Sequence, residues 1–261
     1  MNLENITHQV AEIAVQTGDF IRTDRKRFSY SKVEFKGDSN LVSYVDKESE
    51  KQIIAGLSKI LPEAGFITEE ETTAQGRKEL TWIIDPLDGT TNFVHGIPNY
   101  CVSVGLMQDD QVVAGVVYEV ANDECFYAWK DGGAFLNKNR IHVSEAPAFA
   151  DCVLATGFPY YEFERLEEYL QILHQLMKDT QGLRRMGSAA ADMAYVACGR
   201  YGGYFEYNLN SYDIAGGVAL VQEAGGTVTV FKGGNDFIFG REIVAGGAIH
   251  PQLLDVIQSH W

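Results

Sequence analysis

The chain contains 261 residues, enough for one large domain or two modest domains with a substantial buried core. Hydrophobic residues make up 46% and charged residues 22%, which is typical of globular proteins and excludes disordered, collagen-like and fibrous classes. Lysine and arginine number 21 against 36 aspartates and glutamates, and the net charge of −15 argues against nucleic-acid or membrane binding through a general positive field. A phosphate-bearing ligand would therefore need a local positive charge, for which a metal ion is the obvious source.

The cysteines and the N-terminal segment bear on the cellular compartment. Cys101, Cys125, Cys152 and Cys198 are scattered and form neither a CxxC pair nor a zinc-like spacing, so we expect reduced core residues. The first residues show no basic segment followed by an apolar one, and no stretch approaches the ~20 apolar residues that a membrane span needs. These features predict a cytoplasmic protein that does not bind membranes.

Hydrophobic periodicity predicts the elements of the first half in chain order. Apolar residues at helical spacing indicate one helix near the N-terminus and a second from Asp46 to Leu61, with an exposed loop from Lys36 to Asn40 between them. Runs rich in valine and aromatic residues then predict strands at Leu80–Asp85, Tyr100–Met107, Val112–Glu119 and Glu124–Trp129. Because short turns separate these strands, we expect them to form an antiparallel sheet.

The second half alternates between the two patterns. Helices are predicted at Glu162–Met177, Gly187–Cys198, Asp213–Ala224 and after Pro251, and strands at Cys152–Ala155, Tyr204–Glu206, Thr227–Val230 and Ile243–Ala245. No linker is long enough to separate independent domains. We therefore predict an α+β enzyme in which residues 1–261 form one catalytic unit, with two closely packed halves that meet near residue 145.

The densest chemical signal lies in the segment from Trp82 to Asn92. A buried strand delivers Asp85 to its carboxyl end, and a tight turn brings Asp88 close, with the Leu87 carbonyl between them. Two carboxylates and one backbone oxygen within four residues make a compact set of hard ligands. The hydroxyl and amide of Thr90 then open a helix, which favours an anion site.

Asp88 and two acids in other segments, Glu69 and Asp213, also have simpler interpretations. Asp88 is expected as a helix N-cap in an ordinary polar turn, Glu69 lies in a Glu run that is typical of a solvated face, and Asp213 would also serve as a cap. Spacing alone does not bring the three segments together in space. If they meet, unit charges 4 Å apart repel by about 4 kcal/mol at an effective dielectric of ~20, so the cluster would recruit cations. Ligands that are all oxygens favour Mg²⁺ or Mn²⁺ over zinc.

Several segments together resemble the signatures of one enzyme family. They are Phe66-Ile-Thr-Glu-Glu70, Trp82-Ile-Ile-Asp-Pro-Leu-Asp-Gly-Thr-Thr-Asn-Phe-Val-His95 and Tyr212-Asp-Ile-Ala-Gly216, supported by Leu41–Asp46, Ala155–Phe158 and Gly187–Ala190. The chain resembles the inositol monophosphatase family, which are lithium-sensitive, Mg²⁺-dependent phosphatases. The likeness spans nearly the whole chain. It implies a layered α-β-α-β-α sandwich of the sugar-phosphatase type, usually found as a homodimer.

The resemblance also implies roles for individual residues, by motif position. The first metal would be bound by Glu69, Asp85 and the Leu87 carbonyl, and the second by Asp85, Asp88 and Asp213. Asp46 and Thr90 would orient and deprotonate the attacking water. The phosphate would bind among the residues Leu87, Asp88, Gly89, Thr90 and Asp213, and the alcohol would face Gly187, Ser188, Ala189 and Glu206.

Three positions depart from the family pattern. Thr68 stands where the family usually has glycine, and Tyr212 replaces the usual tryptophan, but neither change removes a ligand atom. The loop from Lys36 to Asn40, where a third and weaker ion would bind, matches the family less well. Two or three Mg²⁺ ions are therefore expected, with Mn²⁺ as a possible substitute.

These observations predict Mg²⁺-dependent hydrolysis of inositol monophosphate by direct attack of activated water, with a small phosphomonoester as the only expected partner besides a second copy of the chain. No serine, cysteine or aspartate lies in a nucleophile motif, so no phosphoenzyme is expected. One alternative keeps the metal site and changes the substrate to fructose 1,6-bisphosphate, histidinol phosphate or 3′-phosphoadenosine 5′-phosphate. A second alternative is a non-catalytic regulatory protein with the same fold.

Overall fold

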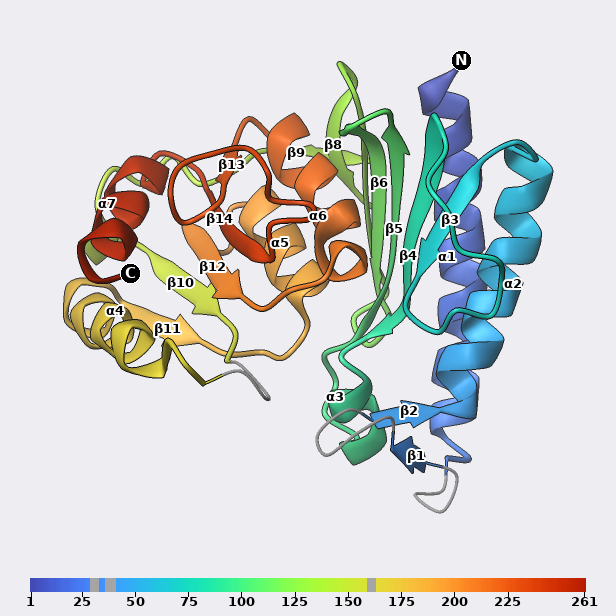
Figure 1. The fold of residues 1–261 in the computed structure, drawn as a ribbon, viewed down its shortest axis with the longest axis horizontal. Coiled ribbons are helices and arrows are strands. Elements are labelled where there is room, and N and C mark those ends of the chain that lie inside the picture. The colour runs from blue at the N-terminus through green and yellow to red at the C-terminus, as the bar shows by residue number, and fades with distance from the viewer. Residues whose placement is uncertain (29–32, 36–40, 159–162) are drawn as a thin grey trace.

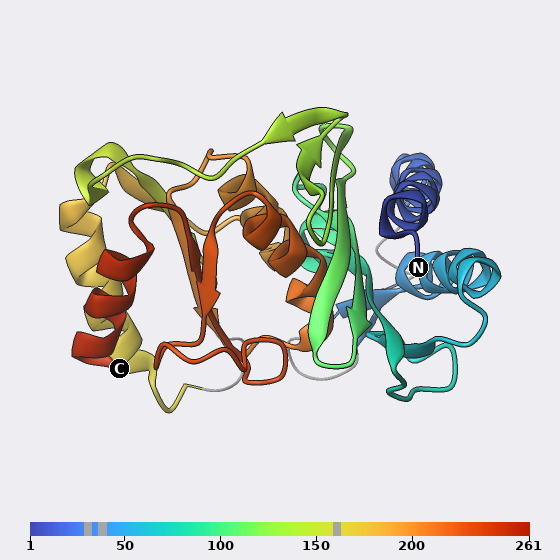
Figure 2. The same cartoon turned by 90° about the horizontal axis from the view of Figure 1, so that it is seen from above.

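The computed structural model describes residues 1–28, 33–35, 41–158 and 163–261. The elements stack in five layers, α-β-α-β-α, as Figures 1 and 2 show. The outer layer at the N-terminal side holds α1 (Leu3–Arg25) and α2 (Tyr44–Ile60), the central layer holds α5 (Ala189–Ala197) and α6 (Ser211–Glu223), and the far layer holds α4 (Leu166–Asp179) and α7 (His250–His260). A short helix, α3 (Thr90–His95), lies at the lower edge. The predicted sandwich is confirmed.

The larger sheet lies between the first and the central helix layers. Its strand order is β3 (Gly65–Thr68), β4 (Leu80–Asp88), β5 (Cys101–Gln108), β6 (Gln111–Glu119), β7 (Glu124–Trp129), β8 (Gly133–Leu136) and β9 (Asn139–Ile141). Strands β3 and β4 are parallel and all other neighbours in this sheet are antiparallel, as the short turns predicted. Helices cover both faces, which explains why the middle strands are apolar almost throughout.

The smaller sheet lies between the central and the far helix layers. Its order is β11 (Gly182–Arg184), β10 (Val153–Thr156), β12 (Gly203–Tyr207), β14 (Glu242–Gly246) and β13 (Thr227–Thr229). Strand β10 pairs in parallel with both neighbours, whereas β14 is antiparallel to both of its own. A 3₁₀ turn at Phe149–Asp151 precedes β10, and a hairpin of β1 (Val33–Phe35) and β2 (Leu41–Ser43) leads into α2. Three hydrophobic cores fill the spaces between the layers.

Helix α6 packs unusually close to the larger sheet. A Cβ atom added at Gly115 of β6 would lie 2.3 Å from the carbonyl oxygen of Gly216, and one added at Gly105 of β5 would lie 2.7 Å from the Ala215 methyl group. The helix and the sheet therefore touch almost backbone to backbone here. This contact sets the depth of the helix whose first turn carries Asp213.

Some predicted boundaries change. The helix expected from Glu162 starts at Leu166, because residues 163–165 form a turn; Glu162 itself and the loop from Lys36 to Asn40 lie outside the described residues. The helix expected from Gly187 starts at Ala189, because Gly187 has a φ of +87° and Ser188 is the N-cap. The short strands β1, β2, β8, β9 and β11 were not predicted. Among the described residues, no helix is long and apolar enough to cross a membrane.

Candidate metal and phosphate site

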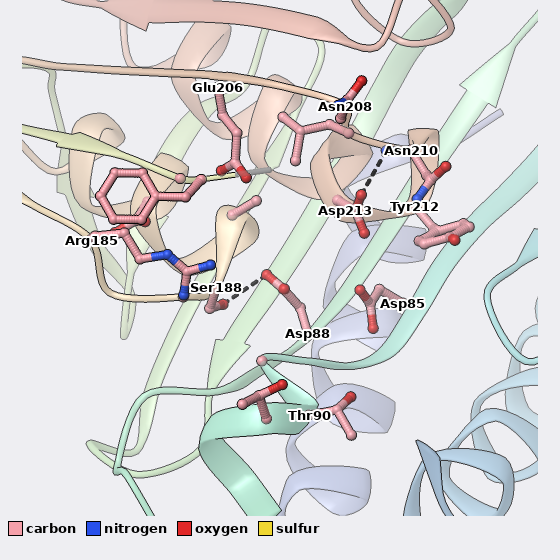
Figure 3. A pocket seen from close by; sticks show the side chains of 18 of the residues that line it. Asp85, Asp88, Thr90, Arg185, Ser188, Glu206, Asn208, Asn210, Tyr212 and Asp213 are labelled. Carbon is pink, nitrogen blue, oxygen red and sulfur yellow. Dashed lines mark hydrogen bonds between the residues drawn. The ribbon is translucent and has the colours of Figure 1, made fainter. Parts of the chain in front are cut away.

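A pocket opens between the two sheets, at the end of β4 and the beginnings of α3, α5 and α6 (Figure 3). It brings together residues from segments far apart in the sequence. All the predicted ligand and substrate residues line it, namely Glu69, Asp85, Leu87, Asp88, Gly89, Thr90, Gly187, Ser188, Ala189, Glu206 and Asp213. The remaining predicted residue, Asp46, is fully buried and bonds to Thr90. The segments that spacing alone could not place together therefore meet.

Strand β4 delivers two of the aspartates. The pairing between β4 and β5 shifts register between Asp85 and Asp88, where Pro86 interrupts the regular strand. Asp85 accepts the Leu87 N–H at 3.0 Å. One oxygen of Asp88 accepts both the Ser188 hydroxyl and the Ala190 N–H at 2.7 Å, so this carboxylate bonds to the first turn of α5.

The interpretation of Asp88 as the N-cap of α3 is wrong. Gly89 occupies that position, with a left-handed φ of +93° and no side-chain cap. A Cβ atom there would lie 3.0 Å from the Asn99 carbonyl oxygen, so glycine suits both the turn and the space. Asp88 is left to face the pocket (Figure 3).

The two other acids arrive from elements on either side of β4. Glu69 directly follows β3, and its N–H continues the parallel pairing by donating to the Ile84 carbonyl at 3.3 Å. Asp213 lies in the first turn of α6 and accepts the Asn210 N–H at 2.6 Å as part of a capping box. Its predicted role as a cap is therefore observed, and the same carboxylate lines the pocket.

Asp46, which is fully buried, pairs with Thr90, which is partly buried and lines the pocket. The Thr90 hydroxyl lies 2.8 Å from one oxygen of Asp46 and 3.0 Å from the Leu87 carbonyl. The other oxygen of Asp46 accepts the N–H and the hydroxyl of Ser43, at 2.9 and 2.7 Å, in the capping box of α2. These bonds fix the rotamer of Asp46 toward Thr90.

A second group of polar side chains lines the part of the pocket next to the smaller sheet. Glu206 of β12 accepts the Tyr204 hydroxyl, and Arg185 lies beside it (Figure 3). Asp192 of α5 was missed by sequence reasoning, although it follows Ser188 by one helical turn and so shares its face. Its side chain is 2% exposed, and its Oδ1 atom has no hydrogen-bond partner within the described residues.

The crowding of acids raises their pKa values. Burial raises the pKa of Asp85 well above its usual range, and repulsion from Glu69, Asp88 and Asp213 raises it further. The pKa of Asp213 is also held well above its usual range, by burial and then by Asp88. Burial raises the pKa of Asp46 against the opposing hydrogen bonds from Ser43 and Thr90.

Two carboxyls have pKa values near neutrality. Burial raises the pKa of Asp88 to about 6, against the hydrogen bonds from Ser188 and Ala190 and the positive charge of Arg185. Burial raises the pKa of Glu206 to about 7, although the Tyr204 hydroxyl and Arg185 both favour its charged form. Among the described residues that line the pocket, the acids outnumber the single arginine, Arg185, so the pocket favours a bound cation.

Comparison with known proteins decides the family. The sequence model of the inositol monophosphatase family matches residues 2–261. The chain belongs to this family. An inositol-1-monophosphatase of Mesorhizobium japonicum is 39% identical over 246 residues, which cover 94% of this chain and 92% of that protein. A Nus factor SuhB of Pseudomonas aeruginosa is 38% identical over 253 residues, covering 95% and 93% of the two chains.

The fold of this inositol monophosphatase family member also matches solved structures. The crystal structure of an extragenic suppressor protein suhB from Bartonella henselae is 39% identical, with a TM-score of 0.92 and full coverage of both chains. The relatives thus include proteins named as enzymes and proteins named as Nus factors, at nearly equal identity.

The residues in the pocket fit a hard divalent cation of the kind that this family uses. The described residues of its lining supply carboxylate and carbonyl oxygens, with no histidine or cysteine among them. No three histidine, cysteine, aspartate or glutamate side chains of the described residues already surround one point closely enough to bind an ion. Instead the acids bond to neighbouring backbone groups, as Asp85 does to Leu87 and Asp213 to Asn210.

Proposed function

We propose that the protein is a Mg²⁺-dependent phosphomonoesterase that hydrolyses inositol monophosphate. The observation that carries this proposal is the meeting of Glu69, Asp85, Asp88 and Asp213 in one pocket beside the hydrogen-bonded pair of Asp46 and Thr90. Acids from three separate segments raise one another's pKa values there. Such repulsion between carboxylates is typical of functional sites and would not be expected of a turn with only a structural role. The proposed ligand sets are those that the family resemblance implies.

Bound Mg²⁺ would polarise the phosphate and lower the pKa of the attacking water. The chain's own contribution to this step is the pair of Asp46 and Thr90. The Thr90 hydroxyl has one hydrogen but lies within bonding distance of both Asp46 and the Leu87 carbonyl. While Asp46 is ionised, the Thr90 hydroxyl donates to it; once Asp46 has taken up a proton, it can donate back to Thr90, and the Thr90 hydroxyl is free to donate to the Leu87 carbonyl. We propose that water gives its proton to Thr90 while Thr90 passes its own to Asp46, whose burial favours the protonated form.

The rest of the pocket would bind the two ends of the ester. The amides of Gly89 and Thr90 would donate to the phosphate oxygens, because the left-handed turn at Gly89 places them at the pocket wall. Glu206 would accept hydrogen bonds from the hydroxyls of the alcohol, with its position fixed by Tyr204. Ser188 and Ala189, which begin α5, would contact the same ring.

Phosphate release from a panel of esters tests the proposal. The panel includes inositol 1-phosphate, fructose 1,6-bisphosphate, histidinol phosphate and 3′-phosphoadenosine 5′-phosphate, each assayed with Mg²⁺ and with EDTA. We expect Mg²⁺-dependent release with inositol phosphate as the best substrate. If another ester is hydrolysed fastest, the proposed chemistry would stand and the proposed substrate would change. Equal release with EDTA would refute the metal assignment.

The second candidate is a regulatory protein that uses the fold without turnover. Relatives named Nus factor SuhB favour it, since they match this chain about as well as those named as phosphatases. The retention of every proposed ligand and of the pair of Asp46 and Thr90 favours the enzyme. No release from any ester, by a folded protein that still binds Mg²⁺, would favour the regulatory role. The expected lithium sensitivity and cytoplasmic location remain predictions. The expected homodimer is also a prediction, and sedimentation with and without Li⁺ and Mg²⁺ tests it.

A further inference from the structure

Glu50 is a buried acid that has no role in the proposed chemistry. It lies on α2, one helical turn after Asp46, and its exposed fraction is 0%. Its carboxylate accepts three hydrogen bonds of 2.7 Å, from the N–H groups of Glu70 and Thr72 and from the Thr72 hydroxyl. These donors belong to the segment that begins with Glu69. Glu50 thus joins α2 to the segment that carries a proposed metal ligand.

The backbone of this segment adopts a conformation that needs support. Glu71 has a φ of +51°, in the left-handed region that residues other than glycine rarely adopt. The N–H groups on either side of it converge on one carboxylate, an arrangement known as a nest for anions. The negative charge of Glu50 therefore holds the chain in this turn directly after Glu69.

The other end of the segment is held as well. Thr68, one of the residues that depart from the family pattern, donates its N–H to the side-chain oxygen of Gln75 at 2.8 Å. The amide nitrogen of Gln75 donates back to the Thr68 hydroxyl at 3.0 Å. Glu69 therefore lies between two anchored residues, Thr68 and Glu70, and its backbone has little freedom to move.

We propose that Glu50 is a positioning residue that preorganises Glu69 for metal binding. The inference rests on the proposed function, since it assumes that Glu69 binds a cation. Glu50 is not assigned as a ligand, because it does not line the pocket and its carboxylate is directed at Glu70 and Thr72. Helix α2 then holds both sides of the site, through Asp46 to Thr90 and through Glu50 to the segment of Glu69.

The structure supplies a matched control for this proposal. Glu119 is also completely buried and accepts two backbone N–H groups, from Ala121 and Asn122, at 3.1 Å. It lies at the end of β6 and does not line the pocket. Glu50→Gln and Glu119→Gln each replace one accepting oxygen by an NH₂ group that cannot accept from N–H. Both should destabilise the fold, but only Glu50→Gln should change metal binding.

The experiment uses the full chain, first freed of metal. Hydrogen exchange of the peptide that spans Glu69 to Thr72 is measured in EDTA, and binding of Mn²⁺ alone is measured by electron paramagnetic resonance. Glu50→Gln should speed exchange of this peptide and raise the Mn²⁺ dissociation constant tenfold or more. At saturating Mg²⁺ its kcat should return to within a few-fold of the wild-type value. Glu119→Gln should leave the dissociation constant within twofold.

Each outcome decides between distinct conclusions. Unchanged Mn²⁺ affinity in Glu50→Gln, or an equal loss in Glu119→Gln, would overturn the positioning role while leaving the proposed metal site in place. A wild-type protein that binds no Mn²⁺ would overturn the proposed function and the role of Glu50 with it. If Glu50→Gln does not fold, Thr72→Val removes only the hydroxyl contact to Glu50, and a smaller rise in the dissociation constant is expected. No rise would overturn the proposal.

Discussion

Replacing Asp88 by asparagine should abolish Mg²⁺-dependent turnover and at the same time stabilise the metal-free protein. The pKa of Asp88 is raised from 3.8 to about 6 by burial, so its ionised form is unfavourable in the folded chain. The raised pKa means that the Asp88 carboxyl makes its full contribution to the stability of the fold below pH 3.8, its ordinary pKa. That contribution is lost as the pH rises through 6, its pKa in the folded chain. The loss amounts to about 3 kcal/mol at pH 8, because each pKa unit corresponds to about 1.4 kcal/mol.

Asparagine should escape this loss without disturbing the local bonds. The Ser188 hydroxyl and the Ala190 N–H both donate to the same oxygen of Asp88, so the asparagine oxygen can accept both while its NH₂ group faces the pocket. The variant cannot ionise. In EDTA at pH 8 we therefore expect it to be more stable than the wild type by up to about 3 kcal/mol, which raises Tm by roughly 5–10 °C.

The assay is thermal and urea unfolding in EDTA between pH 4 and pH 8. The difference between variant and wild type should shrink to less than about 1 kcal/mol at pH 4, where the wild-type carboxyl is also largely neutral. With Mg²⁺ the order should reverse, because the wild type binds the ion in its folded state and the variant binds it weakly. A variant that is less stable than the wild type at pH 8 in EDTA, by an amount that does not vary with pH, would refute the electrostatic reasoning. Wild-type turnover by the variant would refute the ligand assignment.

The remaining predictions concern the wild-type requirement for metal and the two ends of the substrate. At pH 5 protons compete for Asp88, so half-maximal activity should need roughly tenfold more Mg²⁺ than at pH 8; an unchanged requirement would exclude Asp88 as a ligand. Thr90→Val should lower kcat by 10²-fold or more with little change in Mn²⁺ affinity, whereas Thr90→Ser should retain most activity. Glu206→Ala should weaken discrimination among alcohols, which the same ester panel measures; an identical profile would reject its role. Removal of metal by EDTA should lower Tm as well as activity, and full recovery on adding Mg²⁺ provides the check.

The order of elements could be predicted because most of the evidence is local. The antiparallel meander from β5 to β7 follows from short turns between apolar runs, and α1 and α2 follow from their periodicity. The short strands β1, β8 and β9 have too few residues to show a period. Strand β11 pairs in parallel with β10 across the whole of α4, so no local signal marks it.

The proposed metal ligands could be predicted from their motifs, but their supporting contacts could not. Nothing in the spacing indicates that Asp88 bonds to Ser188, a residue 100 positions away, because the sandwich alone brings them together. Glu50 illustrates the same limit. Its position four residues after Asp46 indicates the same helix face, but its partners Glu70 and Thr72 depend on where the segment after β3 returns.

Because α6 contacts the larger sheet almost backbone to backbone, the position of Asp213 is sensitive to small substitutions in that sheet. An alanine at Gly115 would add one methyl group 2.3 Å from the Gly216 carbonyl oxygen and 2.8 Å from the Ala219 methyl group, neither of which can rotate out of the way. The helix would have to move as a rigid rod, and its first turn, which carries Asp213, would move with it. Gly115, which does not line the pocket, thus helps to set the position of Asp213 without touching it. The position of this acid is therefore set by glycines in the sheet and small residues in the helix, and any substitution that fills this space must shift the whole helix.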